Sequence, residues 1–178
     1  MPDTGPFFCR FWLTGDDAAE ARAEIAADQV ALAAARTAGD LVRACQAELG
    51  LGATLIPLGQ EAAAVAHLEE ALRLAREITD PEAEVEALLH LATAQQYLGQ
   101  RALAQELFQR GLDISARAAI STHTHFLLHH RGRCYAEQDL PGPARDCFRQ
   151  ALALREDLGE PRFIASTRTA LAGLPPAD

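Results

Sequence analysis

Residues 144–152 read ARDCFRQAL, residues 104–112 read AQELFQRGL and residues 64–72 read AVAHLEEAL. In each stretch a small residue is followed four positions later by a large apolar residue, and three positions after that by another small one. This spacing places all three on one face of a helix. Small side chains let neighbouring helices approach closely, and the large one fills the gap between them. The stretches therefore predict three equivalent helices, spaced 40 residues apart.

The segments between these stretches follow the same period. Gly59 and Gly99 can adopt the left-handed conformation that closes a helix, and Pro141 prevents continuation of a helix at the corresponding third break. Asp80 before Pro81 is typical of a helix start, with an N-cap followed by a first-turn proline. The pattern predicts repeats at residues 41–80, 81–120 and 121–160, followed by a capping helix at 161–174.

A further helix is expected before the first repeat. Residues 16–38 are rich in Ala and also contain Glu, Gln and Leu, and only Ile25, Val30 and Thr37 among them are β-branched. Asp16 or Asp17 can cap the start of this helix, and Gly39 ends it. We expect residues 16–174 to form a single helical domain.

Composition limits the classes of function. The 178 residues carry a formal net charge of −9, which disfavours undirected attraction to nucleic acid or to an anionic membrane. The four cysteines have no paired spacing, so reduced thiols are expected. No apolar run approaches the roughly 18 residues that a membrane helix needs, and the N-terminus lacks the order of a secretory signal. A cytoplasmic protein without cofactors is expected.

The first 15 residues differ from the repeats. Phe7, Phe8, Phe11 and Trp12 fall within six residues, and so many aromatic side chains are unfavourable in water. The segment could pack on the first helix as a cap, lie in a groove of the domain, or mediate self-association. A homodimer could form through this segment or through the terminal helix.

The repeats resemble the tetratricopeptide repeat, whose second helix carries Ala-x3-Phe and whose first helix carries Leu-Gly followed by an aromatic residue. Ala104 with Phe108 and Ala144 with Phe148 match the first motif, and Ala64 with Leu68 matches it conservatively. The Leu-Gly site is occupied by Leu51-Gly52, Leu91-Ala92 and Arg131-Gly132, and Tyr135 supplies the aromatic residue in the third repeat alone.

The period exceeds the usual 34 residues and resembles the longer repeats of LGN/Pins adaptors and of bacterial regulators with helical-repeat sensor regions. The resemblance implies an all-α fold, a right-handed superhelix of about eight helices.

The resemblance also implies where a partner binds, because the first helices of such repeats line a concave groove that holds a peptide or protein segment. By position, the lining residues would be Gln46, Leu49 and Ala53, then Glu86, Leu89, His90 and Thr93, and finally Phe126, His129, His130 and Arg133. The imidazoles and guanidinium of the third repeat could receive a carboxylate or phosphate. The family's carboxylate clamp uses Lys, Asn and Arg, and this chain contains neither Lys nor Asn.

Metal binding and catalysis are less well supported. His125 and His129, like His130 and Cys134, are four residues apart and could share a helix face. No further ligand at motif spacing completes either pair. The sequence shows no phosphate loop, nucleophile elbow or metalloprotease motif, and Cys134 follows the pattern of a packed helix. We expect neither a metal site nor an enzyme.

Three functions stay open at this point. The first is an adaptor that binds a peptide or protein segment in a concave helical groove. The second is a bacterial sensor module for a peptide or small ligand, acting on a separate effector chain. The third is a structural unit of homo-oligomerisation.

Overall fold

The computed structural model describes residues 13–176, and every regular element in them is an α-helix. The eight helices are α1 (Gly15–Ala38), α2 (Leu41–Leu55), α3 (Glu61–Glu77), α4 (Pro81–Tyr97), α5 (Arg101–Ala118), α6 (Thr124–Ala136), α7 (Pro141–Leu158) and α8 (Pro161–Ala172). The predicted all-α fold is confirmed. The aromatic cluster of residues 7–12 lies outside the described residues, so the three roles considered for it stay predictions.

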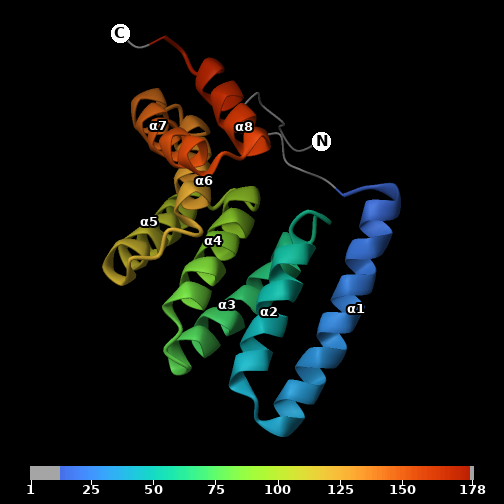
Figure 1. Cartoon of the computed structure of the whole chain (residues 1–178). Helices are drawn as coiled ribbons and strands as arrows, with labels where there is room; N and C mark the ends of the chain where they lie inside the picture. Colours follow the sequence, from blue (N-terminus) through green and yellow to red (C-terminus); the bar gives the residue numbers. More distant parts are fainter. Residues whose placement is uncertain (1–12, 177–178) are drawn as a thin grey trace.

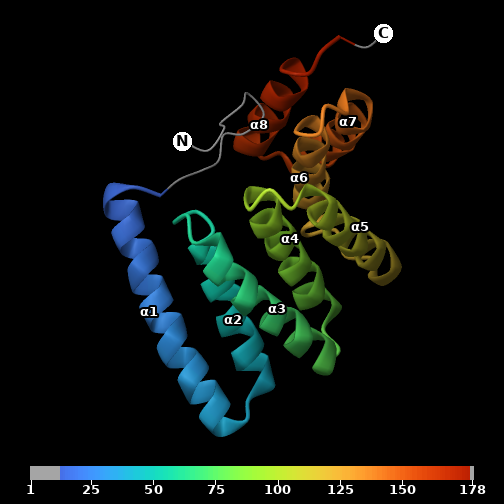
Figure 2. The same ribbon diagram turned by 180° about the vertical axis from the view of Figure 1, so that it is seen from behind.

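The helices stack in chain order into a solenoid (Figures 1 and 2). Each of the pairs α2–α3, α4–α5 and α6–α7 forms one packed unit, and the first helix of each pair also packs on the helix before it. One hydrophobic core extends from α1 to α6. A second, smaller cluster joins α7 to α8 and contains Ala144, Phe148, Ala170 and Leu174.

The predicted helix ends have the expected local causes. The Asp80 carboxylate accepts hydrogen bonds from the backbone N–H groups of Glu82 and Ala83, each at 3.0 Å. Gly59 and Gly99 take φ values of 78° and 82°, in the left-handed region that a residue without Cβ adopts freely. Asp139 takes the corresponding place in the third repeat with a φ of 59°, and Pro141 then opens α7.

Two predicted helix starts were wrong. Thr14 rather than Asp16 or Asp17 precedes α1, and the two aspartates lie in its first turn, where the helix dipole favours negative charge. The first helix of the third repeat begins at Thr124, three residues later than the pattern predicts. Ile120 stands where Asp40 and Asp80 cap the earlier repeats, so no side chain at that position can accept from the backbone.

Close approach of the two helices in a repeat depends on small residues. A Cβ added to Gly132 would lie 2.8 Å from the ring of Phe148, and one added to Gly52 would lie 2.4 Å from the side chain of Leu68. Both large side chains are fully buried. The small and large residues of the sequence pattern are therefore direct contacts between the helices of one repeat.

None of the described helices is both long and apolar enough to cross a bilayer.

The Asp80 cap predicts a measurable loss of stability. We expect Asp80→Ala to lower the free energy of unfolding by about 1 kcal/mol, because two N–H groups of α4 lose their acceptor. Urea denaturation followed by circular dichroism measures the change. Glu160→Ala is the matched control, since Glu160 precedes α8 at the equivalent position and makes no side-chain cap hydrogen bond. An equal loss in both variants would contradict the capping role.

Candidate functional site

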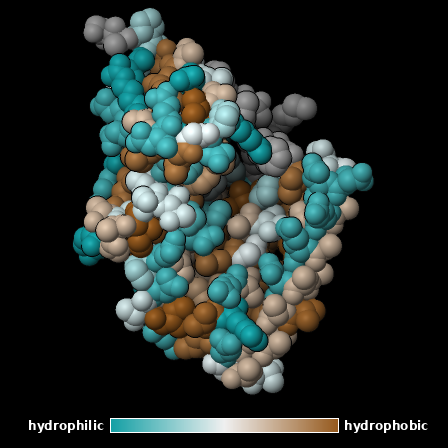
Figure 3. All heavy atoms as spheres, in the orientation of Figure 1, coloured by the Kyte–Doolittle hydropathy of each residue, from teal (hydrophilic) through white to brown (hydrophobic). Residues whose placement is uncertain are grey.

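The first helices of the repeats form the inner side of the solenoid. Within residues 13–176, α2 contacts α4 and α4 contacts α6, whereas no comparable contact joins α3 to α5 or α5 to α7. The second helices therefore spread apart while the first helices converge. Figure 3 shows the surface hollowed on this side, between α1 and the helices of the third repeat.

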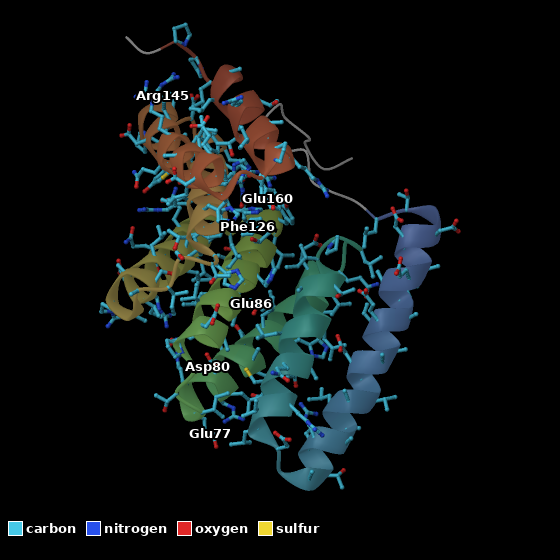
Figure 4. The ribbon with its side chains drawn as sticks, viewed as in Figure 1. Glu77, Asp80, Glu86, Phe126, Arg145 and Glu160 are labelled. Carbon is cyan, nitrogen blue, oxygen red and sulfur yellow. The ribbon has the colours of Figure 1, made fainter. Side chains whose placement is uncertain are left out.

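The predicted groove residues fall into two groups. Gln46 is exposed, and Ala53, Glu86, His90, Phe126 and His130 are half-buried. Leu49, Leu89, Thr93, His129 and Arg133 are buried. In Figure 4, Glu86 and Phe126 lie one above the other along the inner side of the stack.

Gln46, Glu86 and Phe126 occupy equivalent positions of successive repeats, and His90 and His130 occupy another such set. Residues at these positions keep part of their surface open. The groove candidates that the structure leaves partly open thus recur at equivalent positions of α2, α4 and α6, and these positions together are called the strip.

Several of the candidates contact one another or their neighbours. The His90 Nε2 atom lies 3.9 Å from a carboxylate oxygen of Glu86. The Arg133 guanidinium donates to the Tyr97 hydroxyl at 3.3 Å and lies 5.6 Å from the centre of its ring. The His130 ring stacks on Phe108 with 6.2 Å between centroids. Hence the third repeat packs its polar residues against aromatic rings.

Beneath this strip lies a buried polar cluster, made of His125, His129, Arg155 and Thr167. The Arg155 guanidinium donates to the Nδ1 atoms of His125 and His129, each at 3.2 Å. It also donates to the Thr167 hydroxyl at 2.6 Å and to the carbonyl of Phe163 at 3.0 Å. The guanidinium carbon of Arg155 lies 5.6 Å from the ring centre of Phe126 and 5.3 Å from that of Phe163. Arg155 thereby ties α7 to α6 and α8.

The electrostatics of the polar cluster follow from burial. Arg155 is only 2% exposed, and no carboxylate among residues 13–176 forms an ion pair with it. Burial lowers its pKa to about 10, so the guanidinium stays charged at neutral pH. Burial, and then the charge of Arg155, lowers the pKa of His125 to about 4 and that of His129 to about 2. Both imidazoles are therefore neutral acceptors at neutral pH.

Reading the motifs alone missed Arg155 and Thr167. The earlier repeats carry Ala75 and Ser115 where Arg155 stands, and Ala87 and Leu127 where Thr167 stands. The two histidines replace Val85 and Leu89 of the second repeat, which are buried and apolar. A comparison at a shift of 40 residues would have exposed this change from an apolar to a polar interior.

The described thiols are buried, and the His125–His129 pair bonds to Arg155. Burial raises the pKa of Cys134 to about 12 and that of Cys45 to about 11. The Cys134 thiol donates to the backbone carbonyl of Arg101 at 3.4 Å. Nowhere in residues 13–176 are three His, Cys, Asp or Glu side chains grouped to hold a metal. His125 and His129 instead direct Nδ1 at a cation, Arg155, which disfavours a metal ion at the same atoms.

Comparison with known proteins agrees with this architecture. The sequence pattern of the tetratricopeptide repeat matches residues 43–117 and residues 86–157, which together cover more than half of the chain. A search of curated proteins found no match. The matched segments span α2 to α7, whose paired helices and small–large contacts are described above. The chain belongs to the tetratricopeptide repeat family.

Proposed function

We propose that this protein is a non-catalytic interaction module that holds a peptide or protein segment on the inner side of α2, α4 and α6. Tetratricopeptide repeats mediate protein–protein interaction in general. The observation that carries the proposal is the strip of partly open side chains at equivalent positions of three successive first helices, among them Gln46, Glu86 and Phe126. A strip of this kind suits a ligand that runs across the repeats and contacts each of them in turn.

The proposed partner segment would meet different chemistry along the strip. Glu86 and His90 offer polar contacts on α4, whereas α6 offers the Phe126 ring, whose centre lies 5.6 Å from the guanidinium carbon of Arg155. The Arg155 and Arg133 side chains are both buried, and charges in a low-dielectric interior act more strongly on a nearby anion than exposed ones do. This supports the proposal that the third repeat receives a carboxylate or phosphate of the ligand.

The resemblance to LGN/Pins adaptors favours an adaptor as the biological role, whereas the resemblance to bacterial regulators with helical-repeat sensor regions favours a sensor. A sensor for a peptide or small ligand is the second candidate. It is favoured by the polar cluster, because a buried cation without a carboxylate partner in the described part of the chain suits a small anionic ligand. A cytoplasmic location stays a prediction from the sequence.

Reversing the charge of Glu86 tests the proposed groove. A partner is first captured with the intact chain and identified, and its affinity is then measured by isothermal titration calorimetry. We expect Glu86→Arg to weaken binding about tenfold or more, because it places an unmatched charge in the middle of the contact.

The matched control is Glu106→Arg, which makes the same charge change at an exposed position of the second helix α5. We expect this variant to bind within about twofold of the unaltered chain. Equal affinity of Glu86→Arg and the unaltered chain would place the binding surface elsewhere.

A further inference from the structure

The last described helix lacks the partner that every other first helix has. In each complete repeat, the face of the first helix that packs on its own second helix carries four buried residues. These are Cys45, Glu48, Leu49 and Gly52 in α2, Val85, Leu88, Leu89 and Ala92 in α4, and His125, Leu128, His129 and Gly132 in α6. The equivalent residues of α8 are Ala165, Arg168, Thr169 and Ala172, and all four are exposed. α8 is thus a first helix without a second helix.

The first described helix shows the opposite defect. Second helices bury three residues at equivalent positions, namely Ala64, Leu68 and Ala71 in α3, Ala104, Phe108 and Gly111 in α5, and Ala144, Phe148 and Ala151 in α7. The equivalent residues of α1 are Glu24, Asp28 and Ala31. Glu24 and Ala31 are exposed, and Asp28 is half-buried with its carboxylate beside Gly50 of α2. α1 is thus a second helix without a first helix, and it lies at the other end of the stack from α8 (Figures 1 and 2).

The two open faces carry opposite charge. Glu24 and Asp28 lie at the face positions of α1, and Arg168 lies at a face position of α8. The helices as a whole show the same difference, because α1 contains five acidic residues and two arginines, whereas α8 contains two arginines and no acidic residue. Polar end helices also keep a solenoid soluble. If the end faces served only to prevent stacking, we would expect both to carry charge of the same sign, because like charges repel each other. The faces of α1 and α8 carry charge of opposite sign.

We propose that this protein associates head to tail, with α8 of one copy packing on α1 of the next to complete a repeat. The contacts within the complete repeats give the register. Gly52 meets Leu68, the Cys45 thiol donates to the carbonyl of Ala71 at 3.5 Å, and Glu48 bonds to His67 at 2.6 Å. We carry these contacts over by whole repeats, from the first helix to α8 of one copy and from the second helix to α1 of the next copy. Ala172 of α8 then lies opposite Asp28 of α1, Ala165 opposite Ala31, and Arg168 opposite Ala27.

In this register Arg168 lies beside Asp28 of the next copy. The Arg168 side chain is 64% exposed while it bonds to Glu156 at 2.6 Å, so it is accessible to a second carboxylate. The two surfaces are different, and such an interface is not closed by a two-fold axis. Association therefore extends into chains or rings, and the inner sides of successive copies become continuous. This inference does not depend on what the groove binds.

Sedimentation velocity of the intact chain tests the inference. At low salt, we expect the average mass to rise above the 19.1 kDa of one chain as the protein concentration increases from about 5 to about 500 μM, and we expect high salt to reverse the rise. Arg168→Glu and Asp28→Arg should each weaken association at least about tenfold, because each sets like charges opposite one another. Arg149→Glu, at an exposed position of α7, is the control for net charge and should associate like the unaltered chain.

The decisive measurement is a mixture of the Arg168→Glu and Asp28→Arg chains. Every head-to-tail junction between unlike chains then pairs opposite charges, so association should return although each variant alone associates weakly. Circular dichroism first checks that both are helical, and Glu24→Arg replaces Asp28→Arg if the latter is not. A chain that keeps the monomer mass at all concentrations would overturn the inference. So would a mixture that fails to associate, or a two-fold dimer that none of these variants alters.

Discussion

Phe148→Ala is expected to lower the free energy of unfolding by about 3–5 kcal/mol, because the removed ring leaves a cavity that the backbone can fill only in part. Phe148 is fully buried where α7 crosses α6, and its ring lies 5.4 Å from that of His129. It also belongs to the cluster that holds α8. The loss should therefore appear first in the third repeat and in α8, since repeats contact only their neighbours.

Urea denaturation, together with hydrogen exchange of individual segments, measures this loss. Leu158→Ala is the matched control, because Leu158 lies on the same helix and is 57% exposed. We expect the control to cost less than about 1 kcal/mol. In the Phe148→Ala background, Gly132→Ala should be tolerated better than in the unaltered chain, since the ring that its Cβ would meet is gone. Equal losses from Phe148→Ala and Leu158→Ala would contradict the packing described here.

Acid is expected to destabilise the third repeat through the polar cluster. His125 and His129 have folded-state pKa values of about 4 and about 2, below the ordinary value of 6.5. Between about pH 4 and pH 6.5, both imidazoles bind protons in the unfolded chain and stay neutral in the folded chain. Stability contributed by the neutral imidazoles is therefore complete above pH 6.5 and declines as the pH falls below it.

At pH 5 the expected loss is about 2 kcal/mol for each histidine, and about 4 kcal/mol for both, relative to pH 7.5. The charge of Arg155 contributes to this loss of stability, because each protonated imidazole would face the guanidinium at 3.2 Å. No carboxylate from residues 13–176 forms an ion pair with Arg155 to offset this repulsion. Urea denaturation at a series of pH values measures the loss.

The second repeat supplies the control for this prediction. The substitutions His125→Val, His129→Leu, Arg155→Ser and Thr167→Leu together install the residues found 40 positions earlier, at Val85, Leu89, Ser115 and Leu127. This variant should lose about 4 kcal/mol less stability than the unaltered chain between pH 7.5 and pH 5. Some acid sensitivity should remain, because burial also lowers the pKa values of His90 and His130, which the variant keeps. If the unaltered chain and the variant lose the same stability, groups other than His125 and His129 are responsible.

The sequence alone determined the repeat architecture of this protein. Helix ends at Gly59, Gly99 and Asp80, and the small–large pairing of Gly132 with Phe148, depend on local backbone chemistry or on the nearest helix. Such features recur with the period and can be read from a single chain. The error at Thr124 also has a local cause, because the 40-residue period predicted a start at residue 121, where Ile120 cannot cap a helix.

Only the tertiary structure decided which polar residues are buried. The Arg155 contacts join residues of α6, α7 and α8 that are 8 to 30 positions apart in the chain. Tertiary packing likewise separated buried Leu89, Thr93 and Arg133 from the partly open Glu86, His90 and Phe126, although all had been expected on one groove. The physical reason is that helix periodicity sets the direction of a side chain, whereas its exposure and its hydrogen-bond partners depend on how closely the next helices approach.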